Sequence, residues 1–334
     1  MTAASASQLS SRSSALLADI GGTNCRLGIY DPLSSQFTDR FVCSTDDFPS
    51  PRDAIAAFLD RTSSPRPSRA ALALACPITS DRPRLTNTGW QFDRAELIGA
   101  FGLRELVLVN DLVAQARAVA SLGPDGFRAI GPSSAAGIAT PAAIIGAGTG
   151  LGIARIDDLA STILAASEGG HIGFSPSDDV ETELVRLWRQ HLRRITNEHV
   201  VSGPGMVRLY RALGALEDRH VDPIDGPEIV RRALASEDAL CVETAERFAK
   251  ILGSVAGDAA LMFCSSSVVL VGTISNTLAP ILERGGFRSR FEQRGPGGAF
   301  LKSIPTLIAI EPDLGLLGAH ELLKSSFVES AGTA

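Results

Sequence analysis

Two short turns rich in glycine and threonine constrain this chain more than any other feature. Residues 15–30 read ALLADI, GGTN and CRLGIY, and residues 142–153 read AAII, GAGTG and LGI. In each segment an apolar run, a turn and a second apolar run follow one another, which predicts a strand, a tight turn and a strand. Adjacent glycines let a ligand approach the backbone N–H groups, and a threonine hydroxyl adds a donor. Each turn is therefore a candidate phosphate-binding hairpin.

Either hairpin taken alone is more often just a tight turn, because glycine and asparagine favour such turns. Two of them, each opening a group of strands, predict two related halves that face each other across a cleft. The second segment also resembles a dinucleotide fingerprint, but Leu151 stands where the third glycine is needed and a strand follows where a helix is required. The sequence contains no GxxxxGK[ST] phosphate loop either. Both common nucleotide folds are thus disfavoured.

The rest of the chain alternates short apolar runs with amphipathic stretches, which predicts an α/β fold. The predicted strands of the first group are Ala15–Ile20, Cys25–Tyr30, a run near Phe41, Ala71–Ala75 and Leu106–Val109. Those of the second group are Ala142–Ile145, Leu151–Ile156, Thr162–Ala166, Ser267–Val271 and Thr306–Ile310.

Predicted helices lie between these strands. One covers Arg52–Asp60, a second starts at Asp93, and a third is capped by Asp178 or Asp179. Two apolar stripes at helical spacing are expected to lie in the core. They are Val180, Leu184, Leu187 and Trp188, and Phe248, Ile251, Leu252, Val255, Ala259 and Met262.

A length of 334 residues suggests two domains. We expect a disordered tail at 1–14, a small α/β domain at 15–111, a large α/β domain at 112–317, and a helix and tail at 318–334 that return to the small domain. Residues 121–141 are rich in Gly, Pro, Ser and Ala, which predicts a long connecting loop or lid. Residues 284–302 carry five basic residues and one Glu, and we expect a solvated loop without a site there.

Composition narrows the partners and the compartment. A formal net charge of -6 argues against nucleic acid as a main partner. The five cysteines include no CxxC pair, which favours a reducing cytoplasm over a disulfide framework or a zinc site. No apolar run reaches membrane-spanning length, so we expect no membrane partner. A homodimer is a further expectation.

Candidate catalytic residues follow the predicted strand 106–109. Asn110 and Asp111 stand at its carboxyl end, where open α/β sheets usually place ligands. Asp111 is as readily explained as a helix N-cap. The functional interpretation makes it a base that takes a proton from a substrate hydroxyl during phosphoryl transfer. Asp19, at the end of the first strand, is not a direct metal ligand in this scheme but a candidate contact to Mg²⁺ through water.

Three further polar residues are candidates in the second half. Glu168 and His171 lie in the turn EGGH after a predicted strand, and Glu198 precedes the sequence VVSGPG. Each is commonly just an exposed loop residue. Their functional interpretation is hydrogen bonding to sugar hydroxyls, in which Glu accepts the hydrogen bond and His donates or accepts it.

These motifs together resemble the bacterial glucokinase family of the actin and hexokinase superfamily. The matching stretches are ADIGGTNCRLGIYD, ALACPITSDRPRLTNTGW, LVLVNDLVAQA, GAGTGLG, EGGHIGFSP, EHVVSGPGMVRLYRA and DLGLLGAHELL. They cover nearly the whole chain beyond the tail. The chain lacks the clustered zinc cysteines of the related ROK group.

The resemblance implies an α/β fold of two RNase H-like domains that flank a substrate cleft. It implies an ATP-dependent glucokinase that uses Mg²⁺, makes glucose 6-phosphate and has Asp111 as its base. The implied sugar ligands are Asn87, Asn110, Asp111, Glu168, His171 and Glu198. The implied nucleotide-binding residues are Asp19, Gly21, Gly22, Thr23, Asn24, Gly146, Gly148, Thr149, Gly150 and Gly272.

One position departs from the family pattern. A glycine pair usually approaches the adenosine, whereas here Thr273 follows Gly272. A Cβ there is expected to narrow the space for the nucleotide. Two alternatives stay open: a kinase for another hexose or with another donor such as polyphosphate, and a sugar-sensing protein without catalysis. The 14-residue tail is too short for a helix-turn-helix domain, which disfavours a DNA-binding sensor.

Overall fold

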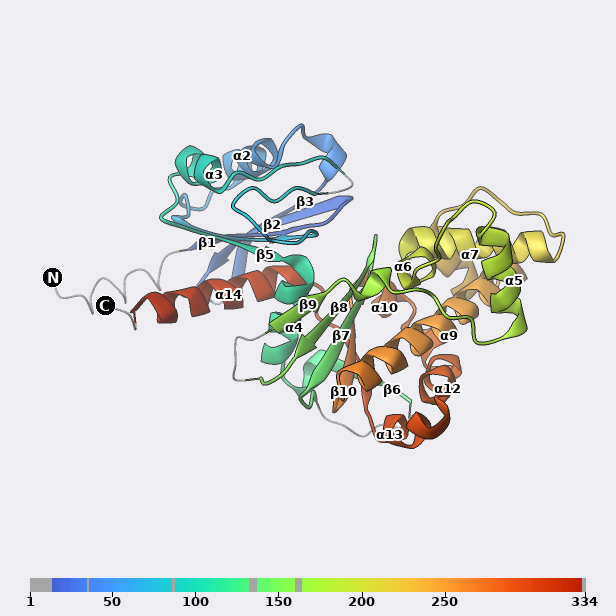
Figure 1. Cartoon of the computed structure of the whole chain (residues 1–334). Helices are drawn as coiled ribbons and strands as arrows, with labels where there is room; N and C mark the ends of the chain where they lie inside the picture. Colours follow the sequence, from blue (N-terminus) through green and yellow to red (C-terminus); the bar gives the residue numbers. More distant parts are fainter. Residues whose placement is uncertain (1–13, 35, 86–87, 132–136, 160–163, 332–334) are drawn as a thin grey trace. The chain divides into compact units, whose positions relative to one another are not determined.

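The computed structural model describes residues 14–34, 36–85, 88–131, 137–159 and 164–331 (Figure 1). Its contacts divide the chain into two compact units. Unit 1 holds the chain up to Ser121 together with the chain from Asp313 onward, and unit 2 is Leu122–Pro312. The expected boundaries were 111/112 and 317/318. The structure differs because the helix that begins at Asp111 and the C-terminal helix, through Leu316, Ala319 and Leu323, both pack on the sheet of unit 1.

Unit 1 is built on a five-stranded sheet in the order β3-β2-β1-β4-β5. Its strands are β1 (Ala15–Ile20), β2 (Asn24–Asp31), β3 (Gln36–Ser44), β4 (Arg69–Leu74) and β5 (Glu105–Asn110). β1, β2 and β3 form an antiparallel meander, while β4 runs parallel to β1 and β5 runs parallel to β4. The carboxyl ends of β1, β4 and β5 therefore meet at one edge.

Helices cover both faces of this sheet (Figure 1). They are α2 (Pro51–Arg61), α3 (Arg94–Phe101), α4 (Asp111–Ser121) and α14 (Leu314–Ala331), with a short 3-10 helix η1 at Thr45–Asp47. Alternate β1 residues serve the two faces: Leu16 packs in the cluster that includes α2 and α3, whereas Leu17 packs with α4 and α14. Asp93 caps α3, as predicted. The period of two along β1 thus gives unit 1 two cores.

Unit 2 repeats the same strand order and adds one strand, giving β6-β11-β10-β7-β8-β9. The strands are β6 (Phe127–Ile130), β7 (Ala142–Ala147), β8 (Leu151–Ile156), β9 (Leu164–Ser167), β10 (Ser267–Val271) and β11 (Thr306–Ala309). The antiparallel run β7-β8-β9 corresponds to β1-β2-β3, and β10 and β11 continue parallel as β4 and β5 do. The prediction of two related halves is confirmed at the level of topology.

The expectation of one long loop over 121–141 is wrong. Residues 127–130 form β6, which pairs antiparallel with β11 at the edge of the sheet. A 3-10 helix, η2 (Pro124–Gly126), precedes it. The backbone N–H and C=O groups of this short segment are satisfied by β11, which is far away in sequence, so local composition does not reveal the strand.

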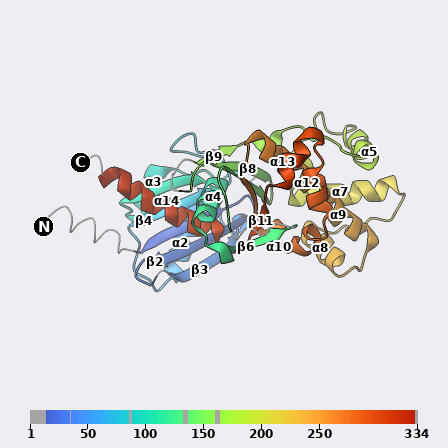
Figure 2. The ribbon, with the colours of Figure 1, turned by 90° about the horizontal axis from the view of Figure 1, so that it is seen from below.

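The helices of unit 2 pack around a large apolar core. They are α5 (Asp179–Trp188), α6 (Asn197–Val200), α7 (Gly203–Leu216), α8 (Gly226–Leu234), α9 (Ala239–Met262), α10 (Thr273–Thr277), α11 (Ala279–Leu282), α12 (Gly286–Glu292) and α13 (Gly298–Lys302), with the 3-10 helices η3 (Gly169–His171) and η4 (Gly295–Gly297). Figure 2 shows α7, α8 and α9 gathered together. Within the described part of the chain, no helix is long and apolar enough to span a membrane.

Two expectations about burial are corrected in unit 2. Val180 and Met262, each at the end of a predicted core stripe, are exposed, although Leu184, Trp188 and the middle of α9 are buried. The segment 284–302 is not a solvated loop, because it folds into α12, η4 and α13 and buries Arg288 and Arg290.

Ion pairs explain why these arginines are buried. The Arg290 guanidinium lies 2.9 Å from both the Asp178 and the Glu181 carboxylates, and Glu181 is itself fully buried. Arg288 donates to the Ile304 and Leu301 carbonyl oxygens at 2.7 and 2.9 Å. Buried charges of this kind need partners, and here those partners tie α12 to α5 and α13.

Candidate active site

The first glycine-threonine hairpin of the sequence joins β1 to β2 in unit 1. The two strands pair antiparallel in register from Ala15↔Tyr30 to Ile20↔Cys25, and the Gly21 N–H closes the turn by donating to the Asn24 carbonyl at 2.9 Å. The Thr45 N–H donates to the Thr23 carbonyl at 2.9 Å. The predicted strand-turn-strand geometry is confirmed, and the turn is braced from η1. Its role in phosphate binding stays a prediction.

Asp19 lies at the end of β1, directly before this turn. Its carboxylate is 3.5 Å from the Arg26 guanidinium on β2, and burial raises its pKa while Arg26 opposes the rise. A Cβ at Gly315, near the start of α14, would lie 2.5 Å from the Asp19 Oδ2 atom. Only a glycine at position 315 therefore leaves room for this carboxylate.

Asn110 and Asp111 mark the passage from β5 to α4. The Asn110 Oδ1 atom accepts from the Leu112 and Val113 N–H groups at 3.1 and 3.2 Å, so Asn110 caps the helix. The Asn110 amide donates to Asp111 Oδ1 at 3.1 Å, and the same oxygen accepts from the Leu112 N–H at 2.8 Å. Asp111 is thus held by its neighbours and retains a second carboxylate oxygen for a substrate.

The charge environment of Asp111 distinguishes it from an ordinary helix-start residue. Burial raises its pKa to about 7, and the nearby carboxylate of Asp19 adds to the rise. Hydrogen bonds from Leu112 and Asn110 act in the opposite direction but do not cancel it. A carboxylate whose pKa lies near the working pH has the strength that a general base needs. Asn110 therefore caps the helix, and the role of Asp111 as a base stays a prediction.

The second hairpin joins β7 to β8 in unit 2. The strands pair antiparallel up to Ala147↔Leu151, and the Gly148 N–H donates to the Gly150 carbonyl at 2.8 Å. Glu198 of α6 reaches this turn, because its Oε2 atom accepts from the Leu151 N–H at 2.9 Å. A Cβ on Gly150 would lie 2.5 Å from that oxygen. The predicted phosphate turn and the predicted sugar ligand Glu198 are therefore in direct contact.

The predicted sugar turn Glu168–His171 packs on the same strand. Gly170 approaches β8 so closely that a Cβ there would lie 2.1 Å from the Leu151 carbonyl oxygen. The Glu168 and His171 side chains are 71% and 60% exposed, with 3.6 Å between their Oε2 and Nε2 atoms. Both side chains are thus free to contact a ligand, while the backbone beneath them is fixed.

Gly272 and the start of α7 lie beside the second hairpin. Gly272 follows β10 at a φ of +92°, and a Cβ there would lie 3.3 Å from the Ala147 carbonyl. Thr273, the departure noted above, begins α10 with an exposed side chain. The Gly203 N–H donates to the Gly148 carbonyl at 2.8 Å, which brings the N-terminus of α7 to the turn. Helix N-termini favour anions.

Sequence reasoning placed no role on Arg26 or on Gly203. The signal for Gly203 is the string SGPG, which carries an N-cap serine and an early proline, and Ser202 does accept from the Gly205 N–H at 3.0 Å. Arg26 had no such local signal, since only the pairing of β1 with β2 brings it to Asp19. The predicted residue Asn87 lies outside the described residues.

The structure collects the other predicted residues into two sets. Unit 1 holds the first hairpin with Asp19, Asn110 and Asp111, and unit 2 holds the second hairpin with Glu168, His171, Glu198 and Gly272. A family model described as Glucokinase matches residues 16–326. The chain belongs to the glucokinase family.

Individual relatives agree with this glucokinase assignment. A protein named Glucokinase from Caulobacter sp. (strain K31) is 37% identical over 310 residues, which cover 91% of this chain and 93% of that protein. The crystal structure of glucokinase from an Antarctic psychrotroph matches with a TM-score of 0.76 and 30% identity, covering 94% and 99% of the two chains. A ROK family glucokinase from Streptomyces griseus, solved with glucose and AMPPNP, shares the fold at 22% identity, with a TM-score of 0.66 and coverage of 93% and 99%. The two-domain sugar kinase architecture expected from the sequence is confirmed.

Proposed function

We propose that this glucokinase-family protein transfers the γ-phosphoryl group of ATP to the 6-hydroxyl of glucose, giving glucose 6-phosphate and ADP. The observation that carries this proposal is Asp111, a carboxylate at the end of β5 whose pKa is raised to about 7 by burial and by Asp19. Family membership supplies the reaction class, and Asp111 supplies a group suited to its proton transfer.

In the proposed mechanism Asp111 accepts the proton of the sugar hydroxyl as that oxygen bonds to the γ-phosphorus and the bond to the ADP oxygen breaks. The Asn110 amide, 3.1 Å from Asp111 Oδ1, orients the carboxylate. Phosphoryl transfer requires mainly positioning and charge stabilisation, so a single well-placed base suffices. Glu168, His171 and Glu198 would hold the other sugar hydroxyls, with Asn87 and Asn110 as further ligands. Closure around the sugar would exclude water, the competing acceptor.

The nucleotide would be held by the two hairpins. Backbone N–H groups and hydroxyls of Gly21–Asn24 and of Gly146–Gly150 are suited to phosphate oxygens, and Gly272 is proposed to lie against the adenosine. The N-terminus of α7, joined to Gly148 through Gly203, adds a favourable dipole. The exposed Thr273 is proposed to weaken nucleotide binding or to change the preferred donor.

Mg²⁺ is proposed to accompany ATP. Among the described residues no group of three or more His, Cys, Asp or Glu side chains is placed to hold a metal ion. The Asp19 carboxylate, at the end of β1 beside the first hairpin, fits a contact through water, because Mg²⁺ prefers oxygen ligands and keeps much of its hydration. Bound there, Mg²⁺ would neutralise phosphate charge during the transfer.

A cytoplasmic location and a homodimeric state are also proposed. All five cysteines are free thiols, and four of them are buried, which suits a reducing compartment. Light scattering on the purified chain would establish the subunit number.

The test is a coupled assay of glucose phosphorylation by ATP, with and without Mg²⁺. We expect turnover that requires Mg²⁺. A panel of mannose, fructose and amino sugars, and of ATP and polyphosphate, separates glucokinase from a kinase of different selectivity. Failure of glucose with every donor would contradict the proposal, and saturable glucose binding without turnover would favour the non-catalytic sensor.

A further inference from the structure

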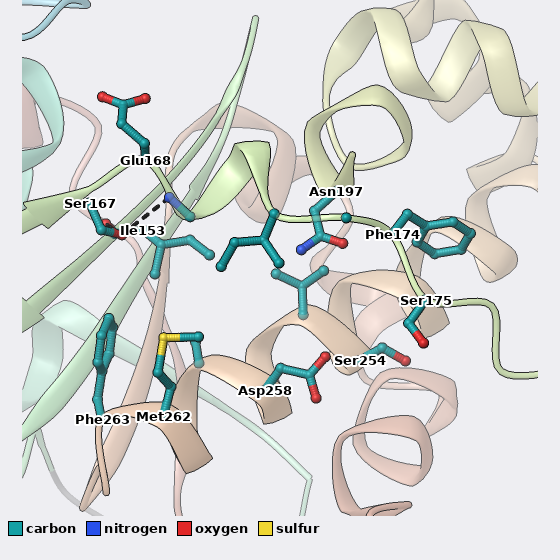
Figure 3. A pocket seen from close by; sticks show the side chains of 15 residues that line it. Ile153, Ser167, Glu168, Phe174, Ser175, Asn197, Ser254, Asp258, Met262 and Phe263 are labelled. Carbon is teal, nitrogen blue, oxygen red and sulfur yellow. Dashed lines mark hydrogen bonds between the residues drawn. The ribbon is translucent and has the colours of Figure 1, made fainter. Parts of the chain in front are cut away.

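A pocket of about 290 Å³ lies inside unit 2, against the predicted sugar turn (Figure 3). Its lining comes from four places: β8 and the end of β9, the segment 168–175, Asn197 at the start of α6, and the C-terminal half of α9 with Phe263 after it. Figure 3 shows the Glu168 carboxylate directed away from the centre of the pocket. The pocket is therefore separate from the face of the turn that carries Glu168 toward a sugar.

The pocket lining is mostly apolar, with a few polar groups. Ile153, Phe174 and Val255 are among its apolar residues. Ser254 is 7% exposed, and its hydroxyl has no hydrogen-bond partner among the described residues. The buried Asn197 amide points into the pocket (Figure 3). A largely apolar cavity with a few convergent polar groups is typical of a small-molecule site.

Charge limits the kind of ligand that this pocket would accept. The lining includes no Lys, Arg or His. Of its two carboxylates, Glu168 is directed away and Asp258 is paired with Arg294 at 2.8 Å. An anion would find no cation there, and a cation would find no free carboxylate within the cavity. An uncharged molecule with an apolar body and one hydroxyl or amide fits both the apolar lining and the Asn197 amide that points into the pocket.

The pocket is joined to both segments that carry predicted sugar ligands. The Gly169 N–H donates to Ser167 Oγ at 3.3 Å, and that hydroxyl donates to the Ile153 carbonyl at 2.8 Å. The Ile172 carbonyl accepts from the Asn197 N–H at 2.9 Å, and Asn197 directly precedes Glu198. Of these six residues, all except Glu198 line the pocket. A ligand inside the pocket would thus contact both the turn that carries Glu168 and the start of α6.

We propose that this pocket binds a small, uncharged, mainly apolar molecule carrying a hydroxyl or amide group, and that its occupancy changes the affinity of the neighbouring turn for sugar. The second part rests on the proposed function, whereas the binding itself does not. The exposed side chains of Ile172 and Met262, 44% and 60% accessible, contribute to the lining and leave it open to entry from solvent.

Calorimetric titration of the full chain with benzyl alcohol and with toluene tests the binding. Both should bind saturably with one site per chain. Ala259→Phe places a ring in the pocket and should abolish both, while Asn197→Leu should weaken benzyl alcohol about fivefold and leave toluene unchanged. Ser289→Ala, on the exposed face of α12, is the control and should change neither. Circular dichroism and melting establish that each variant is folded.

Absence of saturable binding to the wild type, or binding retained in folded Ala259→Phe, would overturn the proposal. So would a probe that dissociates a dimer in light scattering, since that would assign the pocket to a subunit interface. The coupling is tested by the glucose KM, which should shift about threefold or more when benzyl alcohol saturates the wild type and stay constant in Ala259→Phe. An unchanged glucose KM would refute the coupling but not the binding. Absence of any glucose turnover would refute the proposed function, and the calorimetric titration would still show whether the pocket binds a ligand.

Discussion

The two units share one strand order but carry different chemistry at their hairpins. In unit 1 the hairpin lies beside two carboxylates, Asp19 and Asp111; burial raises the pKa of both, and Asp19 raises that of Asp111 further. In unit 2 the hairpin lies beside Glu198, whose carboxylate accepts a hydrogen bond from the Leu151 N–H. It also lies beside the exposed turn of Glu168 and His171. The repeated fold thus presents different groups at the two hairpins, with a buried carboxylate of raised pKa in unit 1 and exposed hydrogen-bonding side chains in unit 2.

The difference begins where the parallel strands end. β5 ends in Asn110 and continues directly into α4, which fixes Asp111 in the first helical turn. The corresponding strand β11 ends at Ala309 and is followed by the exposed Ile310, and the next helix, α14, begins only at Leu314. Both sheets have an edge where parallel strands end. In unit 1 a helix starts directly at this edge and holds a carboxylate there as a candidate base.

The largest effect is expected from Asp111→Asn. The amide keeps the shape of the side chain but accepts no proton, so kcat should fall by roughly 10²- to 10⁴-fold. Glucose affinity, measured by calorimetry, should change little. Asp60→Asn, at an exposed carboxylate on α2 paired with Arg66, is the matched control and should be silent. Turnover near the wild-type rate in Asp111→Asn would show that Asp111 is not the catalytic base.

Glu168→Gln should show the opposite signature. The exposed carboxylate becomes a weaker acceptor for a sugar hydroxyl, so the glucose KM should rise about 10- to 100-fold with a smaller change in kcat. Glu183→Gln, at another exposed glutamate in unit 2, is the control. An unchanged glucose KM for Glu168→Gln would show that the Glu168 carboxylate does not contact the sugar.

Asp111→Asn should also stabilise the folded protein at neutral pH. Because the folded pKa of Asp111 is raised to about 7, ionising it in the folded state costs free energy, and the neutral amide avoids this. We expect a gain on the order of 2 kcal/mol in the free energy of unfolding at pH 8, after allowance for partial exposure. The gain should shrink as the pH falls from 7 toward 4. Urea unfolding at pH 8 and pH 5 measures it, and equal gains at both would contradict the raised pKa.

Gly150→Ala and Gly148→Ala test whether hairpin and sugar ligand act together in unit 2. A Cβ at Gly150 would lie 2.5 Å from Glu198 Oε2, whereas one at Gly148 would meet nothing within 4 Å. The displaced carboxylate should raise the glucose KM about tenfold in Gly150→Ala, a loss of ~1.4 kcal/mol. Gly148→Ala should leave it near the wild-type value. Equal glucose KM values for the two variants would show that Glu198 acts independently of the turn.

Much of the strand framework could be predicted because its signals are local. Apolar runs bounded by turn residues give β1, β8 and β10 their observed ends, Ala15–Ile20, Leu151–Ile156 and Ser267–Val271. β6 was missed because it is a four-residue edge strand containing Arg128, and its strand partner among the described residues, β11, lies far along the chain.

Side-chain environments were harder to predict, since they depend on distant partners. Arg290 was expected to be exposed to solvent, yet it is buried and pairs with the Glu181 carboxylate. Glu181 lies 109 positions earlier in the sequence and becomes a neighbour only when α5 packs near α12. Asp111 is similar, because its raised pKa depends first on burial in the folded chain and then on Asp19 across the β1-β4-β5 edge. The motif identified the residue, and only the fold supplied its charge state.

The pH dependence of kcat/KM for glucose tests the central claim most directly. Asp111 must be ionised to accept a proton, so kcat/KM should fall about tenfold per pH unit below an apparent pKa near 7. The residual activity of Asp111→Asn should lack this acidic limb. A wild-type profile that stays flat from pH 8 down to pH 5, or a variant that keeps the same limb, would contradict the assignment of Asp111 as the base.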